Sequence, residues 1–172
     1  MFVTGIIAVG KSTVAQALAE RLPKSVHLRG DAFRRMIVNG AVAPLPPMSD
    51  EAFPQLRLRY SIAAMAAHAY CDCGFTVVYQ DIAVGPMLDE VIGMLRGRSP
   101  VCLVVLCPTA EVVAERDASR AKTGYGAWTT AMLDSELRTN TTRVGLWLDT
   151  SELTVAETVD TILARLNEAR LR

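Results

Sequence analysis

Short apolar runs alternate with segments of helical periodicity along this chain. Five runs rich in apolar and β-branched residues predict strands. They cover residues 1–4, 25–30, 75–81, 101–107 and 144–151. The run at 101–107, VCLVVLC, is apolar at every position, which is typical of a parallel strand that is buried on both faces.

The segments between and after these runs place apolar residues at helical spacing. They cover residues 12–22, 31–38, 51–73, 85–97, 109–120, 130–140 and 154–171. Pro86 favours a helix start, Gly74 favours a helix end, and Thr154 with Glu157 forms a capping box. The alternation predicts an α/β fold of three layers, with a mainly parallel five-stranded sheet flanked by helices.

Composition limits the class of protein. A length of 172 residues suits a single domain spanning 1–172, and 51% hydrophobic residues predict a sizeable buried core. Lys and Arg total 18, as do Asp and Glu, and this balance argues against a general nucleic-acid binder. No signal peptide is recognisable, and no apolar run reaches the ~20 residues of a membrane span. We therefore expect a cytoplasmic protein without a membrane partner.

The cysteines and histidines form no recognisable metal motif. Cys71 and Cys73 lack a second matching pair, and Cys102 and Cys107 lie in an apolar run. His68 has no second ligand placed beside it. We expect reduced, structural cysteines rather than a metal site.

The segment GIIAVGKS, residues 5–12, satisfies the pattern G-x-x-x-x-G-K-[ST]. In such a loop, backbone N–H groups converge on phosphates, the Lys adds a positive charge, and the Ser hydroxyl ligates Mg²⁺. The loop follows an apolar strand and opens an amphipathic helix, which is the context that the pattern requires. The stiff Val9 would leave the loop unperturbed if its side chain points away from the phosphates. The residues predicted to bind ATP and Mg²⁺ here are Gly5, Ala8, Val9, Gly10, Lys11, Ser12 and Thr13, with Ser12 as the metal ligand.

Asp81 ends a predicted buried strand at the carboxyl edge of the sheet, where open parallel sheets bind ligands. This position predicts that Asp81 is either an outer partner of Mg²⁺ or a second carboxylate near the molecule that would receive the phosphoryl group. The alternative is a solvated charge at the end of a strand.

Beyond the loop, the chain resembles the small P-loop kinases related to nucleotide, gluconate, shikimate and adenylylsulfate kinases, most of all their chloramphenicol-phosphotransferase-like branch. The resemblance covers nearly the whole chain, although the loop is its one highly specific motif. It is carried by the segments GIIAVGKST, RGDAFRRM, VVYQD, ERDASRAKTGY and LWLDTSELTVAETVDTIL. In such kinases the loop after the last strand lies beside the adenine.

The resemblance also implies roles for the residues just past the second strand. An acidic residue there faces the acceptor hydroxyl, and Asp31 holds the matching position. It would accept the hydroxyl proton or orient the nucleophile, with Arg34 or Arg35 pointing into the same cleft. The alternatives are a helix N-cap role for Asp31 and solvated positions for the arginines.

The resemblance also implies a lid over about residues 116–128. Arg116 would bind the nucleotide, while Arg120 would join Lys11 and Asp31 as a catalytic residue by neutralising the transferring phosphoryl group. Gly124 and Gly126 would allow the segment to hinge. The alternative is an ordinary basic helix end on the surface.

Together these features predict an ATP-dependent phosphotransferase that acts on a hydroxyl of a small molecule. The acceptor side would lie within about residues 31–73 and suits a partly apolar antibiotic, nucleoside or sugar derivative. Its expected wall comprises Met48, Phe53, Leu56, Tyr60 and Met65, interleaved with Arg57 and Arg59. A nucleoside or nucleotide kinase, using Arg34, Arg35, Arg57 and Arg59 around an acceptor phosphate, is one alternative. A nucleotide-dependent switch with slow hydrolysis is another, and both a monomer and a homodimer remain open.

Overall fold

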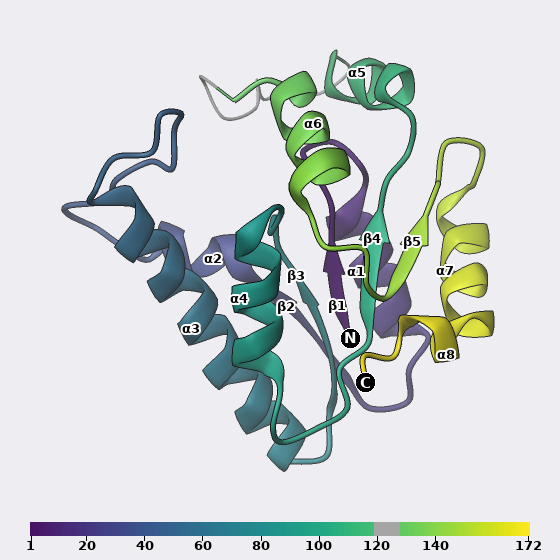
Figure 1. Cartoon of the computed structure of the whole chain (residues 1–172). Coiled ribbons are helices and arrows are strands. Elements are labelled where there is room, and N and C mark those ends of the chain that lie inside the picture. The colour runs from purple at the N-terminus through teal and green to yellow at the C-terminus, as the bar shows by residue number, and fades with distance from the viewer. Residues whose placement is uncertain (119–127) are drawn as a thin grey trace.

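The computed structural model of the chain describes residues 1–118 and 128–172. In these two stretches five strands form one parallel sheet in the order β2-β3-β1-β4-β5 (Figure 1). The strands are β1 (Phe2–Thr4), β2 (Ser25–Arg29), β3 (Thr76–Gln80), β4 (Leu103–Leu106) and β5 (Leu146–Leu148). All five expected strands are present, and the predicted α/β fold with a parallel five-stranded sheet is confirmed.

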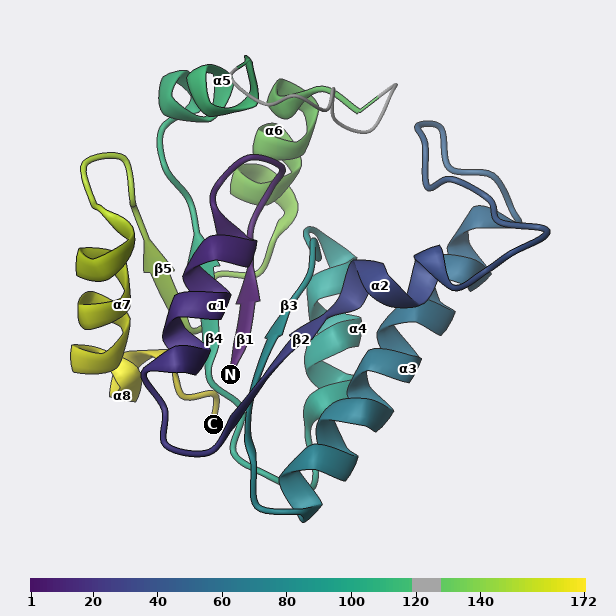
Figure 2. The ribbon, with the colours of Figure 1, turned by 180° about the vertical axis from the view of Figure 1, so that it is seen from behind.

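Helices cover both faces of the sheet. The pair α1 and α7 packs on one face, which Figure 2 shows from the front, while α3 and α4 pack on the other. The helices in the described stretches are α1 (Lys11–Glu20), α2 (Gly30–Arg35), α3 (Ala52–Asp72), α4 (Pro86–Leu95), α5 (Ala110–Ala118), α6 (Thr130–Asn140), α7 (Val155–Ala164) and α8 (Leu166–Ala169). Because both faces are covered, all four residues of β4 are buried, as the continuous apolar run predicted.

Helix ends agree with the local signals at some positions and differ at others. The capping box at the start of α7 is confirmed, with Thr154 and Glu157 exchanging hydrogen bonds. The helix expected over 154–171 is interrupted at Arg165 and continues as the short α8. The expected N-cap role of Asp31 is wrong: α2 begins at Gly30, so Asp31 already lies within the first turn.

The parallel sheet determines where a ligand site can form. The carboxyl ends of all five strands lie at one edge, and α5 and α6 lie beyond that edge in Figure 1. The segments that follow the adjacent strands β1, β2 and β3 therefore meet there. Over residues 1–118 and 128–172, no helix has both the length and the apolar character needed to span a bilayer.

Candidate active site

The loop between β1 and α1 has the backbone of an anion-binding turn. Gly10, directly before α1, has φ 91°, and Ala8 has φ 62°, a left-handed conformation that is uncommon for a residue with a Cβ atom. Gly10 has no side chain with which to cap α1, so the first N–H groups and the positive dipole end of the helix face the loop. Val9 is 2% exposed and packs in the core, so its side chain does not occupy the ligand side of the loop.

Close packing also constrains the loop at its start. A Cβ atom on Gly5 would lie 2.4 Å from the carbonyl oxygen of Leu106, at the end of β4. Lys11, the first residue of α1, is largely buried and donates a hydrogen bond from Nζ to the carbonyl of Ile6. The lysine side chain therefore folds back along the loop that it is expected to serve.

The loop borders a hollow of about 370 Å³, here called the loop pocket. It is the place where most of the predicted site residues meet. Its lining comprises Ile7, Ala8, Gly10, Lys11, Ser12, Thr13, Arg29, Asp31, Gln80, Asp81, Ile82 and Arg116. Arg120 lies outside the described residues, so its predicted place in the catalytic set stays a prediction.

Asp31 stands on the wall of the loop pocket between two arginines. Its carboxylate forms an ion pair with Arg35 one helical turn later, and Arg29 Nε lies 3.8 Å from its Oδ1 atom. Oδ1 is buried, and no described residue forms a hydrogen bond with it. A carboxylate oxygen in the pocket is thus available to a ligand, whereas Arg35 is engaged with Asp31 itself.

Arg34 is placed elsewhere. It lines a small hollow beside Val42, Gln55 and Arg59, and it contributes to neither the loop pocket nor the large apolar pocket described below. The structure therefore separates Arg34 from Asp31, although both belong to the short helix α2.

Asp81 follows β3 and is almost completely buried. Its Oδ1 atom accepts a hydrogen bond of 2.8 Å from the backbone N–H of Ile82 and lies 2.9 Å from Nη2 of Arg59. Its Oδ2 atom accepts a hydrogen bond of 3.0 Å from the hydroxyl of Tyr79. Burial raises the pKa of the Asp81 carboxyl, and the adjacent Arg59 guanidinium opposes that rise. Burial likewise raises the pKa of Tyr79, which keeps its hydroxyl protonated as a donor.

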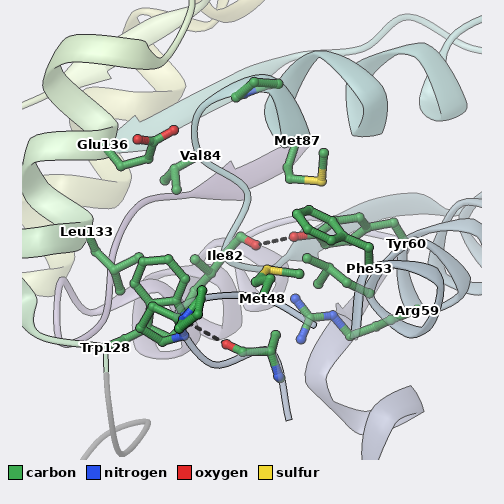
Figure 3. A pocket seen from close by; sticks show the side chains of 15 residues that line it. Met48, Phe53, Arg59, Tyr60, Ile82, Val84, Met87, Trp128, Leu133 and Glu136 are labelled. Carbon is green, nitrogen blue, oxygen red and sulfur yellow. Dashed lines mark hydrogen bonds between the residues drawn. The ribbon is translucent and has the colours of Figure 1, made fainter. Parts of the chain in front are cut away.

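A second pocket of about 460 Å³ lies next to the loop pocket, between α3, α4 and α6. Figure 3 shows its side chains converging from these elements, with the Tyr60 hydroxyl donating to the carbonyl of Ile82 at 2.7 Å. We call it the apolar pocket. Its lining comprises Pro44, Pro46, Pro47, Met48, Phe53, Leu56, Arg59, Tyr60, Ile82, Val84, Pro86, Met87, Trp128, Leu133 and Glu136.

The apolar pocket includes most of the expected acceptor wall but not all of it. Met48, Phe53 and Tyr60 line it, together with Leu56 and Arg59. Met65 is instead 60% exposed on the outer side of α3. Arg57 also points away, because its guanidinium forms hydrogen bonds of 2.8 and 2.7 Å with the carboxylate of Glu90. The expected wall was therefore wrong for these two residues.

Several pocket residues were not foreseen from the sequence. Val84 and Met87 follow β3, Leu133 and Glu136 belong to α6, and all four come from segments outside residues 31–73. Trp128 also lines the pocket, and its Nε1 atom donates a hydrogen bond to the carbonyl of Pro44 (Figure 3). The loop before α3 lines another side of the pocket with Pro44, Pro46 and Pro47.

The two pockets meet at Ile82, which lines both of them. Asp81 belongs to the wall of the loop pocket and Arg59 to the wall of the apolar pocket. The buried ion pair between them therefore forms part of the partition where the pockets join.

Arg116 connects the loop pocket to a third hollow, of about 260 Å³, between the loop and α7. Its Nη2 atom donates a hydrogen bond of 3.0 Å to the carbonyl of Thr150, in the segment after β5. This places the predicted nucleotide-binding arginine beside both hollows. The hollow also contains Thr154 and Val155 from the start of α7.

No metal centre built from several side chains is found in the described part of the chain. Within residues 1–118 and 128–172, no group of three or more His, Cys, Asp or Glu residues is placed to hold an ion. All four cysteines are free. A cation in the loop pocket would therefore depend on hydroxyl and carboxylate groups together with ligand oxygens.

Comparisons with known proteins agree on the fold. A crystal structure of a sugar kinase from Janibacter sp. HTCC2649 is 22% identical, with a TM-score of 0.68 over 98% of this chain and 94% of that chain. The Deinococcus radiodurans tunicamycin resistance protein is 18% identical, with a TM-score of 0.68 over 100% and 97% of the two chains. A gluconokinase from Sinorhizobium meliloti 1021 is 22% identical, with a TM-score of 0.65 over 96% and 90%.

At the level of sequence, no curated protein matches the chain. A family described as an AAA domain, AAA_33, matches residues 1–142, a range that includes the loop, Asp31, Asp81 and Arg116. The match over most of the chain leads to one assignment: this protein belongs to the AAA_33 family, which is described as an AAA domain.

Proposed function

We propose that the protein is an ATP-dependent phosphotransferase that transfers the γ-phosphoryl group to a hydroxyl of a small molecule. The observation that carries the proposal is the junction at Ile82, where the loop pocket opens beside the apolar pocket. A phosphoryl donor held by the loop and an acceptor held among apolar side chains would meet at this junction. Phosphoryl transfer depends mainly on such positioning and on neutralisation of charge.

The loop pocket supports the nucleotide side of the proposal. The uncapped N-terminus of α1 and the positive-φ residues Ala8 and Gly10 suit a phosphate chain. Lys11 would add its charge at the β and γ phosphates. The hollow between the loop and α7 would receive the nucleoside, with Arg116 flanking it.

Mg²⁺ fits the donors that the loop pocket contains. The hydroxyl of Ser12 and the buried oxygen of Asp31 without a hydrogen-bond partner lie in the same hollow. Ser12 would hold the ion, and Asp81 would act as an outer partner, because both of its oxygens already accept hydrogen bonds from the protein. When bound, Mg²⁺ supplies charge neutralisation at the phosphate oxygens.

Asp31 is the proposed contact for the acceptor hydroxyl. Its carboxylate would accept the proton of that hydroxyl. At the same time the acceptor oxygen would bond to the γ-phosphorus of ATP, and the bond between this phosphorus and the oxygen that bridges it to the β-phosphate would break. Arg120, proposed for the transition state, would complete the charge neutralisation. The reaction would take place in one domain spanning 1–172, acting in the cytoplasm without a nucleic-acid or membrane partner.

The nucleotide-kinase alternative is supported less by the contacts. It requires cations free to hold a phosphate on the acceptor. Arg35 is paired with Asp31, Arg57 with Glu90, and Arg59 with Asp81. Arg34, the fourth arginine of this alternative, lines a separate small hollow. The acceptor side is therefore better suited to a less charged molecule.

The proposal is tested by acceptor-stimulated ATP turnover. We would measure ADP release with Mg·ATP alone and with a panel of aminoglycosides, phenicols, nucleosides and sugars. An acceptor that raises turnover should do so in the wild type and in Lys24→Ala, but not in Lys11→Ala. Lys24 is a matched control because its exposed ammonium donates to the carbonyl of Cys73, away from the loop. Turnover that no acceptor stimulates would favour a nucleotide-dependent switch instead.

A further inference from the structure

We propose that the apolar pocket selects acceptors without an anionic group, because Asp81 neutralises Arg59, the cation in the wall of that pocket. The acceptor would be an uncharged, mainly apolar alcohol that carries one oxygen able to accept a hydrogen bond from Arg59. This inference rests on the proposed phosphotransferase function and specifies the chemical class of its acceptor. It excludes sugar acids, other carboxylates and phosphorylated acceptors.

The composition of the wall is the first argument. Among the described lining residues, Arg59 and Glu136 are the two that carry a charge, and the remainder are apolar apart from the Tyr60 hydroxyl. That hydroxyl is already engaged with the carbonyl of Ile82. Apolar walls of this kind favour ligands that bury hydrocarbon or aromatic surface.

The ion pair is the second argument. The side chains of Arg59 and Asp81 are 7% and 4% exposed and lie 2.9 Å apart. An anionic acceptor that approached Arg59 would also approach the Asp81 carboxylate, and burial of two like charges in one site is unfavourable. Glu136, on the opposite wall in Figure 3, adds a further negative charge. The local charge of the pocket thus disfavours an anion even though an arginine is present.

The third argument concerns what Arg59 can still do. Its Nε atom is buried, and none of the described residues accepts a hydrogen bond from it. Figure 3 shows the guanidinium turned into the pocket, below Met48. A ligand would meet the part of the guanidinium that lines the pocket, where a neutral oxygen, such as a carbonyl, ether or hydroxyl, would accept a hydrogen bond without adding charge. Arg59 is thereby a specificity-determining residue for an uncharged ligand.

Two fluorescent probes with the same skeleton test the inference on the full-length protein. N-phenyl-1-naphthylamine is uncharged, and 8-anilinonaphthalene-1-sulfonate adds one sulfonate to the same ring system. We expect the uncharged probe to bind at least about tenfold more tightly. Val84→Phe, which fills the apolar pocket, should weaken its binding by about tenfold or more. Val38→Phe, the same enlargement at a position that is 90% exposed and outside the pocket lining, should leave binding unchanged.

The ion pair is tested by Asp81→Asn, which removes the negative charge behind Arg59. The preference for the uncharged probe over the sulfonate should then fall by about tenfold. Glu90→Gln is the matched control, because it breaks the exposed pair with Arg57 and should not change the preference. If circular dichroism shows that Asp81→Asn does not fold, the comparison of the two probes in the wild type and in Val84→Phe still decides the question.

Two results would overturn the inference. One is a sulfonate probe that binds as tightly as the uncharged probe and is lost in Val84→Phe. The other is binding of the uncharged probe that Val84→Phe does not affect. Binding of a fluorescent ATP analogue, measured in parallel, reports on the proposed function separately, since Lys11→Ala should abolish it while leaving both probe affinities unchanged.

Discussion

Replacement of Gly30 by Ala tests the packing that holds Asp81 in place. Gly30 begins α2 and is buried against the end of β3. A Cβ atom on Gly30 would lie 1.9 Å from Oδ2 and 2.6 Å from Cγ of Asp81, and 3.0 Å from Cε2 of Tyr79. The carboxylate cannot withdraw without loss, because Arg59, the Ile82 N–H and the Tyr79 hydroxyl all hold it.

The magnitude follows from opposing effects. Alanine is favoured over glycine in a helix by about 0.5–1 kcal/mol. Overpacking costs about 1–3 kcal/mol, and a displaced hydrogen bond to a charged group costs about 1.5–3 kcal/mol. We therefore expect Gly30→Ala to destabilise the protein by about 2–4 kcal/mol, which lowers Tm by about 5–15 °C for a domain of this size.

Thermal unfolding followed by circular dichroism measures this change. Gly93→Ala is the control: Gly93 lies within α4, and beyond the backbone of that helix no described residue has an atom within 4 Å of a Cβ placed there. Its Tm should rise by about 1–4 °C through helix propensity alone. A Gly30→Ala protein as stable as the wild type would refute the reasoning, since Asp81 could not then occupy its position against α2.

The remaining predictions concern the loop pocket and one histidine. Asp31→Asn should retain nucleotide binding but lower turnover by about 10²–10⁴-fold, and unchanged turnover would remove its role as a base. Arg116→Ala should mainly raise the KM for ATP in steady-state kinetics, so an unchanged KM would contradict the nucleotide contact. Burial lowers the pKa of His27 from its usual 6.5, so the neutral form is favoured on folding. The stability that His27 supports is therefore present above about pH 6.5 and is lost as the pH falls through the lowered pKa. The Tm of His27→Gln should fall less than that of the wild type between about pH 7 and pH 5, whereas parallel curves would exclude this role.

Features that depend on a few neighbouring residues were predictable from the sequence. The loop at residues 5–12, the capping box of Thr154 and Glu157, and the buried strand β4 all depend on interactions within one element or between adjacent ones. The placement of Asp81 at the carboxyl edge of the sheet also followed, because a parallel sheet puts the carboxyl ends of its strands on one side.

The rotation of α3 about its axis was not predictable. This helix carries apolar and charged residues around its circumference, so periodicity alone gave no basis for separating Arg59 and Tyr60, which point inward, from Arg57 and Met65, which point outward. The orientation is decided by how α3 packs against β3 and α4, and periodicity within the helix does not specify that packing.

The sequence by itself determined that this chain forms a loop of the G-x-x-x-x-G-K-[ST] pattern in a parallel α/β domain, because local patterning and turn chemistry suffice for both. Only the tertiary structure decided that Arg59 pairs with Asp81 and that the two pockets join at Ile82. The physical reason is that charge pairing and cavity shape depend on side chains from separate elements. Their distances are set by how the helices pack on the sheet.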